Sequence, residues 1–124
     1  MNNAPFQSVE LVVTTPEPYG TALAYHARCR TTLGVLCQLL AQAESHVIIA
    51  SPFMQAGHGL MDGALSGALR VALQRGVNVD VLSTGPGLKT IDRACLASGV
   101  SGDLRFFRPA VNIADEQRIG SHAK

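Results

Sequence analysis

The sequence predicts an α/β fold in which a mostly parallel, mixed sheet is flanked by helices. Two observations carry this prediction. Short runs of β-branched and aliphatic residues stand at 47–50 and 77–82, and segments with apolar residues at three- and four-residue spacing surround them. Strands that alternate with helices of this length imply right-handed crossovers between parallel neighbours.

The N-terminal segment, residues 1–29, is expected to contain a strand and a loop. Residues 10–15 (ELVVTT) predict a short strand, because β-branched residues dominate this run. The prolines and glycine of residues 16–20 should end this strand and form the loop. The remaining residues, 30–124, are expected to belong to one α/β domain.

Residues 33–43 predict an amphipathic helix, because their apolar side chains recur on one face. Thr31 or Thr32 can serve as its N-cap. The run 47–50 (VIIA) that follows is continuously apolar. We therefore expect a strand buried on both faces, as in a parallel sheet that helices cover on both sides.

A second helix should span about residues 60–75, with Arg75 near its negative end. Gly76 fits the C′ position that follows a helix. Residues 77–82 (VNVDVL) alternate between apolar and polar side chains, which predicts a strand. Residues 83–87 (STGPG) should then form a turn.

A third helix is expected at about residues 88–98, followed by a strand at 104–108 that Pro109 ends. Residues 110–119 show no regular period, which predicts a loop. The last residues, 120–124, read as the beginning of another strand.

Composition narrows the class of protein. The 124 residues are 47% apolar and 15% charged, with a net charge of +1, which excludes a disordered tail and does not indicate a strongly basic nucleic-acid binder. No apolar run approaches the roughly 18 residues that a membrane span needs, and the start does not resemble a signal peptide. We therefore expect a cytoplasmic protein. The three cysteines lack the spacing of a zinc site, so no metal is expected.

Candidate chemistry stands in residues 121–124, Ser-His-Ala-Lys. On an extended strand residues i and i+2 share a face, so His122 and Lys124 would reach into one pocket. The imidazole can attack phosphorus, while the ammonium neutralises charge on the nonbridging oxygens. Taken alone, H-x-K is a weak signal that also occurs by chance in many proteins.

Residues 30–124 resemble the N-terminal half of a phospholipase D superfamily domain. The likeness consists of the strand HVIIASPFM, a helix ending in ALQRG, the strand VNVDVL directly after it, and H-x-K about 40 residues later. The resemblance implies that His122 is the nucleophile of a phosphohistidine mechanism and that Lys124 binds phosphate. It implies cleavage of lipid or nucleic-acid phosphodiesters without a metal or other cofactor. The stretch VELVVTTP resembles phospholipase-D-like proteins of bacterial anti-phage defence systems.

The family motif continues after H-x-K with four residues, an Asp and a segment bearing an Asn, and a second motif supplies the His that acts as general acid and base. None of these follows Lys124 in this sequence. We therefore expect a fragment that is truncated within the motif strand and inactive by itself, with a missing C-terminal half or a homodimer as its partner. One alternative is a non-catalytic α/β module that binds nucleic acid or a partner. Another is a doubly wound domain in which H-x-K is coincidental.

Three further residues are candidates for substrate binding, because loops at the carboxyl ends of parallel strands commonly line sites. Ser51 directly follows the strand 47–50, and His58 lies in the next loop, so both could border a substrate groove. Arg108 could extend a positive groove toward His122. The simpler explanation for each is a solvated loop or edge residue.

Overall fold

The computed structural model describes residues 9–16, 18–52, 54, 60 and 63–109. The chain divides into two compact units, Met1–Leu36 and Cys37–Lys124, and the division falls within helix α2 (Thr32–Gln42). The fold class is α/β, with parallel-strand sheets and flanking helices, as the sequence predicts. No helix in the described part of the chain is long and apolar enough to cross a membrane.

The N-terminal unit contains two short parallel strands, β1 (Val12–Val13) and β2 (Arg30–Thr31), with helix α1 (Tyr19–Ala27) between them. The backbone N–H of Arg30 donates to the carbonyl of Leu11 at 2.8 Å. The Thr31 hydroxyl accepts a hydrogen bond from the Gly34 N–H at 3.1 Å. Thr31 therefore caps the start of α2, in agreement with the sequence prediction.

The expected loop at residues 16–20 is wrong in its second half, because α1 begins at Tyr19 and contains the buried Gly20. Pro18 stands at the N-cap of this helix. A proline is tolerated there, because the N–H that it lacks would have no partner within the helix. The prolines therefore mark the start of a helix and not an extended loop.

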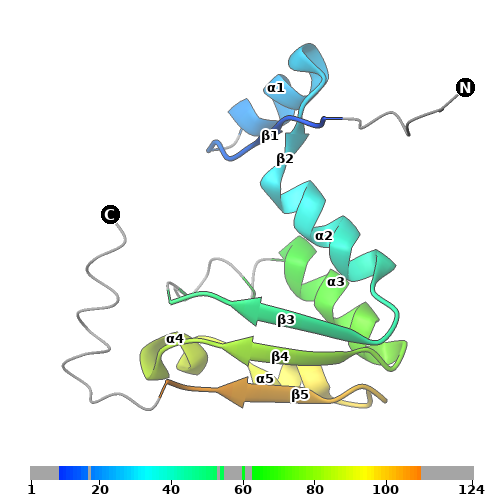
Figure 1. The fold of residues 1–124 in the computed structure, drawn as a ribbon, viewed down its shortest axis with the longest axis vertical. Coiled ribbons are helices and arrows are strands. Elements are labelled where there is room, and N and C mark those ends of the chain that lie inside the picture. Colours follow the sequence, from blue (N-terminus) through cyan, green and yellow to red (C-terminus); the bar gives the residue numbers. More distant parts are fainter. Residues whose placement is uncertain (1–8, 17, 53, 55–59, 61–62, 110–124) are drawn as a thin grey trace, which may run out of the picture. The chain divides into compact units, whose positions relative to one another are not determined.

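The second unit contains three parallel strands in the order β3 (His46–Ala50), β4 (Asn78–Leu82) and β5 (Leu104–Phe107) (Figure 1). Helix α3 (Gly63–Gln74) connects β3 to β4. The junction of α3 with β4 confirms the role predicted for Gly76, which has φ 90°. Its N–H donates to the carbonyl of Leu73 at 3.0 Å, and the Val77 N–H donates to that of Ala72 at 3.1 Å, the two bonds of a Schellman motif.

The single helix expected at residues 88–98 is wrong, because two short helices occupy this region. They are α4 (Gly85–Lys89) and α5 (Arg93–Ala97). Residues 90–92 separate the two helices. Asp92 caps α5, since its carboxylate accepts a hydrogen bond from the Cys95 N–H at 2.9 Å. A local side-chain bond thus starts a new helix where apolar spacing alone suggested a continuous one.

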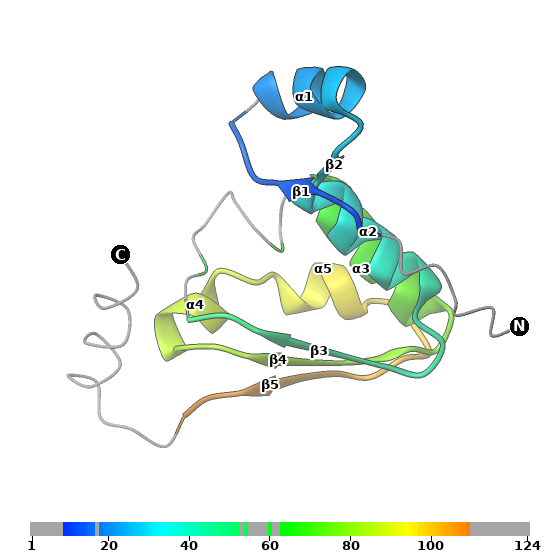
Figure 2. The ribbon, with the colours of Figure 1, turned by 45° about the horizontal axis from the view of Figure 1, so that its top comes forward.

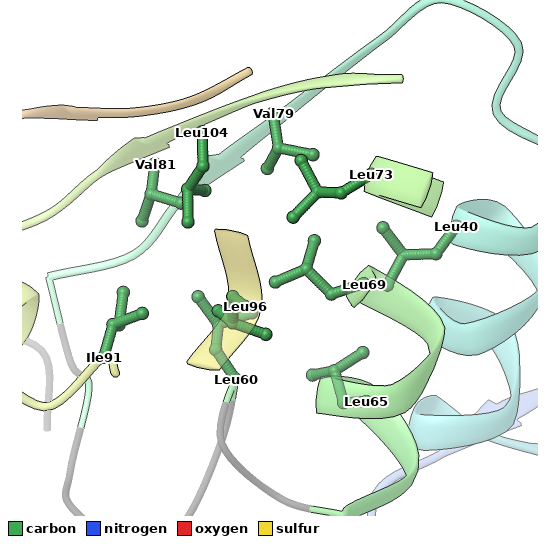
Figure 3. Packing of buried hydrophobic residues seen from close by; sticks show 10 residues of the cluster. All are labelled: Leu40, Leu60, Leu65, Leu69, Leu73, Val79, Val81, Ile91, Leu96 and Leu104. Carbon is green, nitrogen blue, oxygen red and sulfur yellow. The ribbon is translucent and has the colours of Figure 1, made fainter. Parts of the chain in front are cut away.

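The core of the second unit lies between the sheet and the helices. Figure 3 shows aliphatic side chains of β4 and β5 opposite leucines of the helices. The buried cluster consists of Leu40, Leu60, Leu65, Leu69, Leu73, Val79, Val81, Ile91, Leu96 and Leu104. Since the chain has few aromatic residues, branched aliphatic side chains supply most of this packing.

The helices α3 and α5 cover the same face of this sheet (Figure 2). The strand at 47–50 is therefore not buried on both faces, which corrects the sequence prediction: Val47 and Ile49 pack on the core, whereas Ile48 is 69% exposed. Right-handed crossovers that advance in one direction, from β3 to β4 to β5, place their helices on one face. The opposite face, here named the open face, carries the exposed Ile48, Leu82 and Phe107.

Candidate functional site

The carboxyl ends of the three parallel strands bring distant segments of the chain to one edge. Ser51 follows β3, residues 83 and 84 follow β4, and residues 108 and 109 follow β5. A cavity of about 260 Å³, here named the edge cavity, is lined by Ala50, Ser51, Pro52, Leu82, Ser83, Thr84 and Pro109. Such an edge is where open α/β sheets commonly bind ligands.

Hydrogen bonds around Ser83 hold the ends of the strands together. Ser83 is only 3% exposed, and its hydroxyl donates to the carbonyl of Ser51 at 2.6 Å. The Ser51 N–H donates to the carbonyl of Leu82 at 3.0 Å, and the Ser83 N–H donates to that of Phe107 at 3.2 Å. The wall of the edge cavity is thus fixed by bonds that link all three strands.

The lining continues to Thr84, directly before α4. Thr84 caps this helix, because its hydroxyl accepts a hydrogen bond from the Gly87 N–H at 3.1 Å. A Cβ atom at position 87 would lie 2.4 Å from the Ser83 hydroxyl, so a glycine is needed for this close approach. The turn expected at residues 83–87 is therefore wrong from Gly85 onward, where the helix already begins.

Arg108 stands beside the lining of the cavity. Its guanidinium carbon lies 3.1 Å from the point that a Cβ atom at position 85 would occupy, so Gly85 leaves room for it. The arginine is exposed, and its chain neighbour Pro109 lines the cavity. A positive charge therefore stands next to a small concave surface.

Two of the predicted site residues thus come together at this edge: Ser51 lines the cavity and Arg108 stands beside it. His58, His122 and Lys124 lie outside the described residues. Among the residues that the structure does describe, no group of three or more His, Cys, Asp or Glu side chains could hold a metal ion.

The edge cavity is largely apolar in character. The hydroxyls of Ser83 and Thr84 are engaged in the hydrogen bonds described above. The remaining lining includes the side chains of Ala50, Leu82 and Pro109. This arrangement favours an apolar group in the cavity and a negative charge near Arg108.

A second polar arrangement, which sequence reasoning missed, crosses the open face. The carboxylate of Asp80 accepts hydrogen bonds from Arg105 Nε at 2.8 Å and from Arg105 Nη2 at 2.9 Å. His46 Nε2 lies 2.8 Å from the same carboxylate. The paired guanidinium of Arg105 holds the pKa of Asp80 below its ordinary value, with His46 adding to the effect and burial opposing it. Asp80 in turn raises the pKa of Arg105.

The sequence contains the three ionisable residues of this cluster, but their meeting can be predicted only when the pairing register of the strands is known. Asp80 pairs with Arg105 across β4 and β5 and with Ile48 of β3, two residues from His46. Alternate residues of a strand share a face, so the three side chains meet once these pairings are known. Without the register, the sequence does not show that Arg105 lies opposite Asp80.

No protein-family model, no curated protein and no solved structure matches this chain.

Proposed function

We propose that the chain is the N-terminal part of a phospholipase-D-like phosphodiesterase. The observation that supports this proposal is the order of elements around the H-x-K sequence. Arg75 and Gly76 directly follow helix α3, β4 begins at Asn78, and β5 runs parallel to β4. In the sequence, H-x-K comes later, at residues 122–124. The resemblance stated above implies this same order.

In the proposed mechanism, the imidazole of His122 attacks phosphorus and displaces one alkoxide, which leaves a phosphohistidine. A second histidine, which the resemblance assigns to a later motif, gives its proton to the leaving oxygen. Water then gives a proton back to that second histidine and attacks phosphorus, which releases the phosphate monoester and restores His122. Lys124 stabilises the negative charge on the nonbridging oxygens in both steps.

The test uses a protein that extends past Lys124 to the motif Asp and the second motif that the resemblance implies. The substrate is bis(4-nitrophenyl) phosphate, and release of 4-nitrophenolate is the readout. We expect His122→Asn to lower kcat by about 10³-fold or more, because the nucleophile is lost. His26→Asn, on the exposed surface of α1, is the matched control and should keep full activity. EDTA should leave the rate unchanged.

Full activity of His122→Asn would overturn the assignment of this residue. The 124-residue chain, assayed in parallel, should show no turnover. If the complete protein also fails to cleave phosphodiesters but binds DNA or RNA in a salt-dependent way, the chain is a non-catalytic nucleic-acid-binding module instead.

A further inference from the structure

We infer that the edge cavity, together with Arg108, is a binding site for a small amphiphilic anion, a ligand with a short apolar group and an anionic head. This goes beyond the proposed function, because it concerns described residues at the carboxyl edge and not the H-x-K sequence.

The size of the cavity limits the apolar group. Ligand pockets commonly measure roughly 300–1,000 Å³. The edge cavity measures about 260 Å³, so it suits a short chain or a small ring. The apolar side chains of Ala50, Leu82 and Pro109 would gain from covering such a group.

The two buried hydroxyls of the lining, those of Ser83 and Thr84, argue against a nucleobase. A pocket that recognises a nucleobase must offer hydrogen-bond partners along the edge of the base. Here the Ser83 hydroxyl is directed to the carbonyl of Ser51, and the Thr84 hydroxyl is used by the Gly87 N–H. The proton of the Ser83 hydroxyl and one lone pair of the Thr84 hydroxyl are thus already used, which leaves these two groups fewer hydrogen bonds for the edge of a base.

Arg108 supplies the charge that complements the anionic head. Its guanidinium stands beside Gly85, the residue next to Thr84 of the lining, while its neighbour Pro109 forms part of the wall. A guanidinium has five N–H donors in a planar fork, and phosphate and carboxylate groups fit this fork well. The apolar wall and the cation are therefore close enough to bind two parts of one small molecule.

The experiment is a titration of the 124-residue chain, followed by the amide shifts of Ser51, Ser83 and Thr84 in NMR spectra. The probes are n-butyl phosphate, butyrate, inorganic phosphate, 1-butanol and thymidine 5′-monophosphate. We expect n-butyl phosphate to bind saturably, and inorganic phosphate and 1-butanol each to bind at least about 10-fold more weakly, because each lacks one of the two contributions. Comparison with butyrate distinguishes a phosphate head from a carboxylate head.

Variants test the two halves of the site. Ala50→Phe should fill the cavity and weaken binding of n-butyl phosphate by about 10-fold or more, whereas Ile48→Phe, on the same strand but outside the lining, should not. Arg108→Gln should have a similar effect, and Lys89→Gln, an exposed cation of α4, should have none. Dispersed core amide signals confirm that each variant is folded.

Equal affinity for n-butyl phosphate and inorganic phosphate would overturn the inference, and so would tighter binding of thymidine 5′-monophosphate. The comparison of probes uses the unaltered chain, so it stays decisive even if a variant unfolds. Because binding is measured without catalysis, loss of this site and loss of the phosphodiesterase proposal are separate results.

Discussion

At the scale of single residues, Arg75 connects two helix ends. Its Nη2 donates to the carbonyls of Leu40 at 2.8 Å and Ala43 at 3.0 Å, which belong to the last turn of α2 and the residue after it. Carbonyls at a helix end lack partners within the helix, so this side chain satisfies two of them. The sequence predicts that Gly76 ends α3, but the partners of Arg75 depend on the packing of α2 beside α3.

We expect Arg75→Ala to lower the free energy of unfolding by about 1–2 kcal/mol, because two hydrogen bonds from a charged donor are lost. Partial exposure of this donor to water limits the loss. Urea unfolding followed by circular dichroism measures this loss. Gln74→Ala, an exposed change one residue earlier, is the control and should stay within about 0.5 kcal/mol of the unaltered chain. A loss no larger than in this control would show that the carbonyls gain nothing from Arg75.

At the scale of elements, the ion cluster of Asp80 links all three strands of the sheet. Arg105 of β5 and His46 of β3 both contact this carboxylate of β4, whose side chain is only 13% exposed. The pKa of Asp80 is lowered, so the native state binds fewer protons in acid than the unfolded state does. The resulting stabilisation is complete above the unfolded pKa, about 3.9, and is lost as the pH falls through the lower native pKa.

The pH dependence of stability should therefore change in Asp80→Asn. Between about pH 7 and pH 5 this variant should be less stable than the unaltered chain, and the difference should shrink below about pH 4. Guanidinium unfolding at a series of pH values measures the difference. Glu44→Gln, an exposed residue outside the sheet, controls for net charge and should leave the acid part of the curve unchanged. A difference between Asp80→Asn and the unaltered chain that stays constant as the pH falls below about 4 would contradict this origin.

The elements also show where sequence reasoning succeeds. The alternating run at 77–82 predicts β4 well, because polar and apolar positions of a strand face opposite sides. The run at 47–50 predicts a strand but not its burial, since four apolar residues without alternation do not reveal that Ile48 faces away from the core. The break between α4 and α5 depends on the cap at Asp92, and the spacing of apolar residues does not reveal a cap.

At the scale of the whole molecule, the stability of the second unit depends on its aliphatic core. We expect Leu69→Ala to lower the free energy of unfolding by about 3–5 kcal/mol. Leu69 of α3 is fully buried in the core, and removal of its side chain leaves a cavity there. Thermal and urea unfolding measure this loss. The matched control is Val71→Ala on the same helix, where the side chain is 49% exposed and the loss should be about 1 kcal/mol or less. Similar losses in both variants would contradict the assigned core.

The candidate site is predictable from the sequence only in part. Ser51 and Arg108 follow strands, so a parallel sheet places both at one edge, and this much can be expected before the structure is known. The bond from the Ser83 hydroxyl to Ser51 and the space that Gly85 leaves for Arg108 cannot be expected. They depend on side-chain positions across strands that are distant along the chain.

The order of the strands in the sheet also has a consequence for synthesis on the ribosome. Strands β3, β4 and β5 neighbour one another in the same order in which they are translated. Each crossover therefore joins adjacent strands, so each new pairing needs only the one helical connection that precedes it. The pair β3–β4 with α3 can form while β5 is still being made, and each new strand then adds to an edge that already exists.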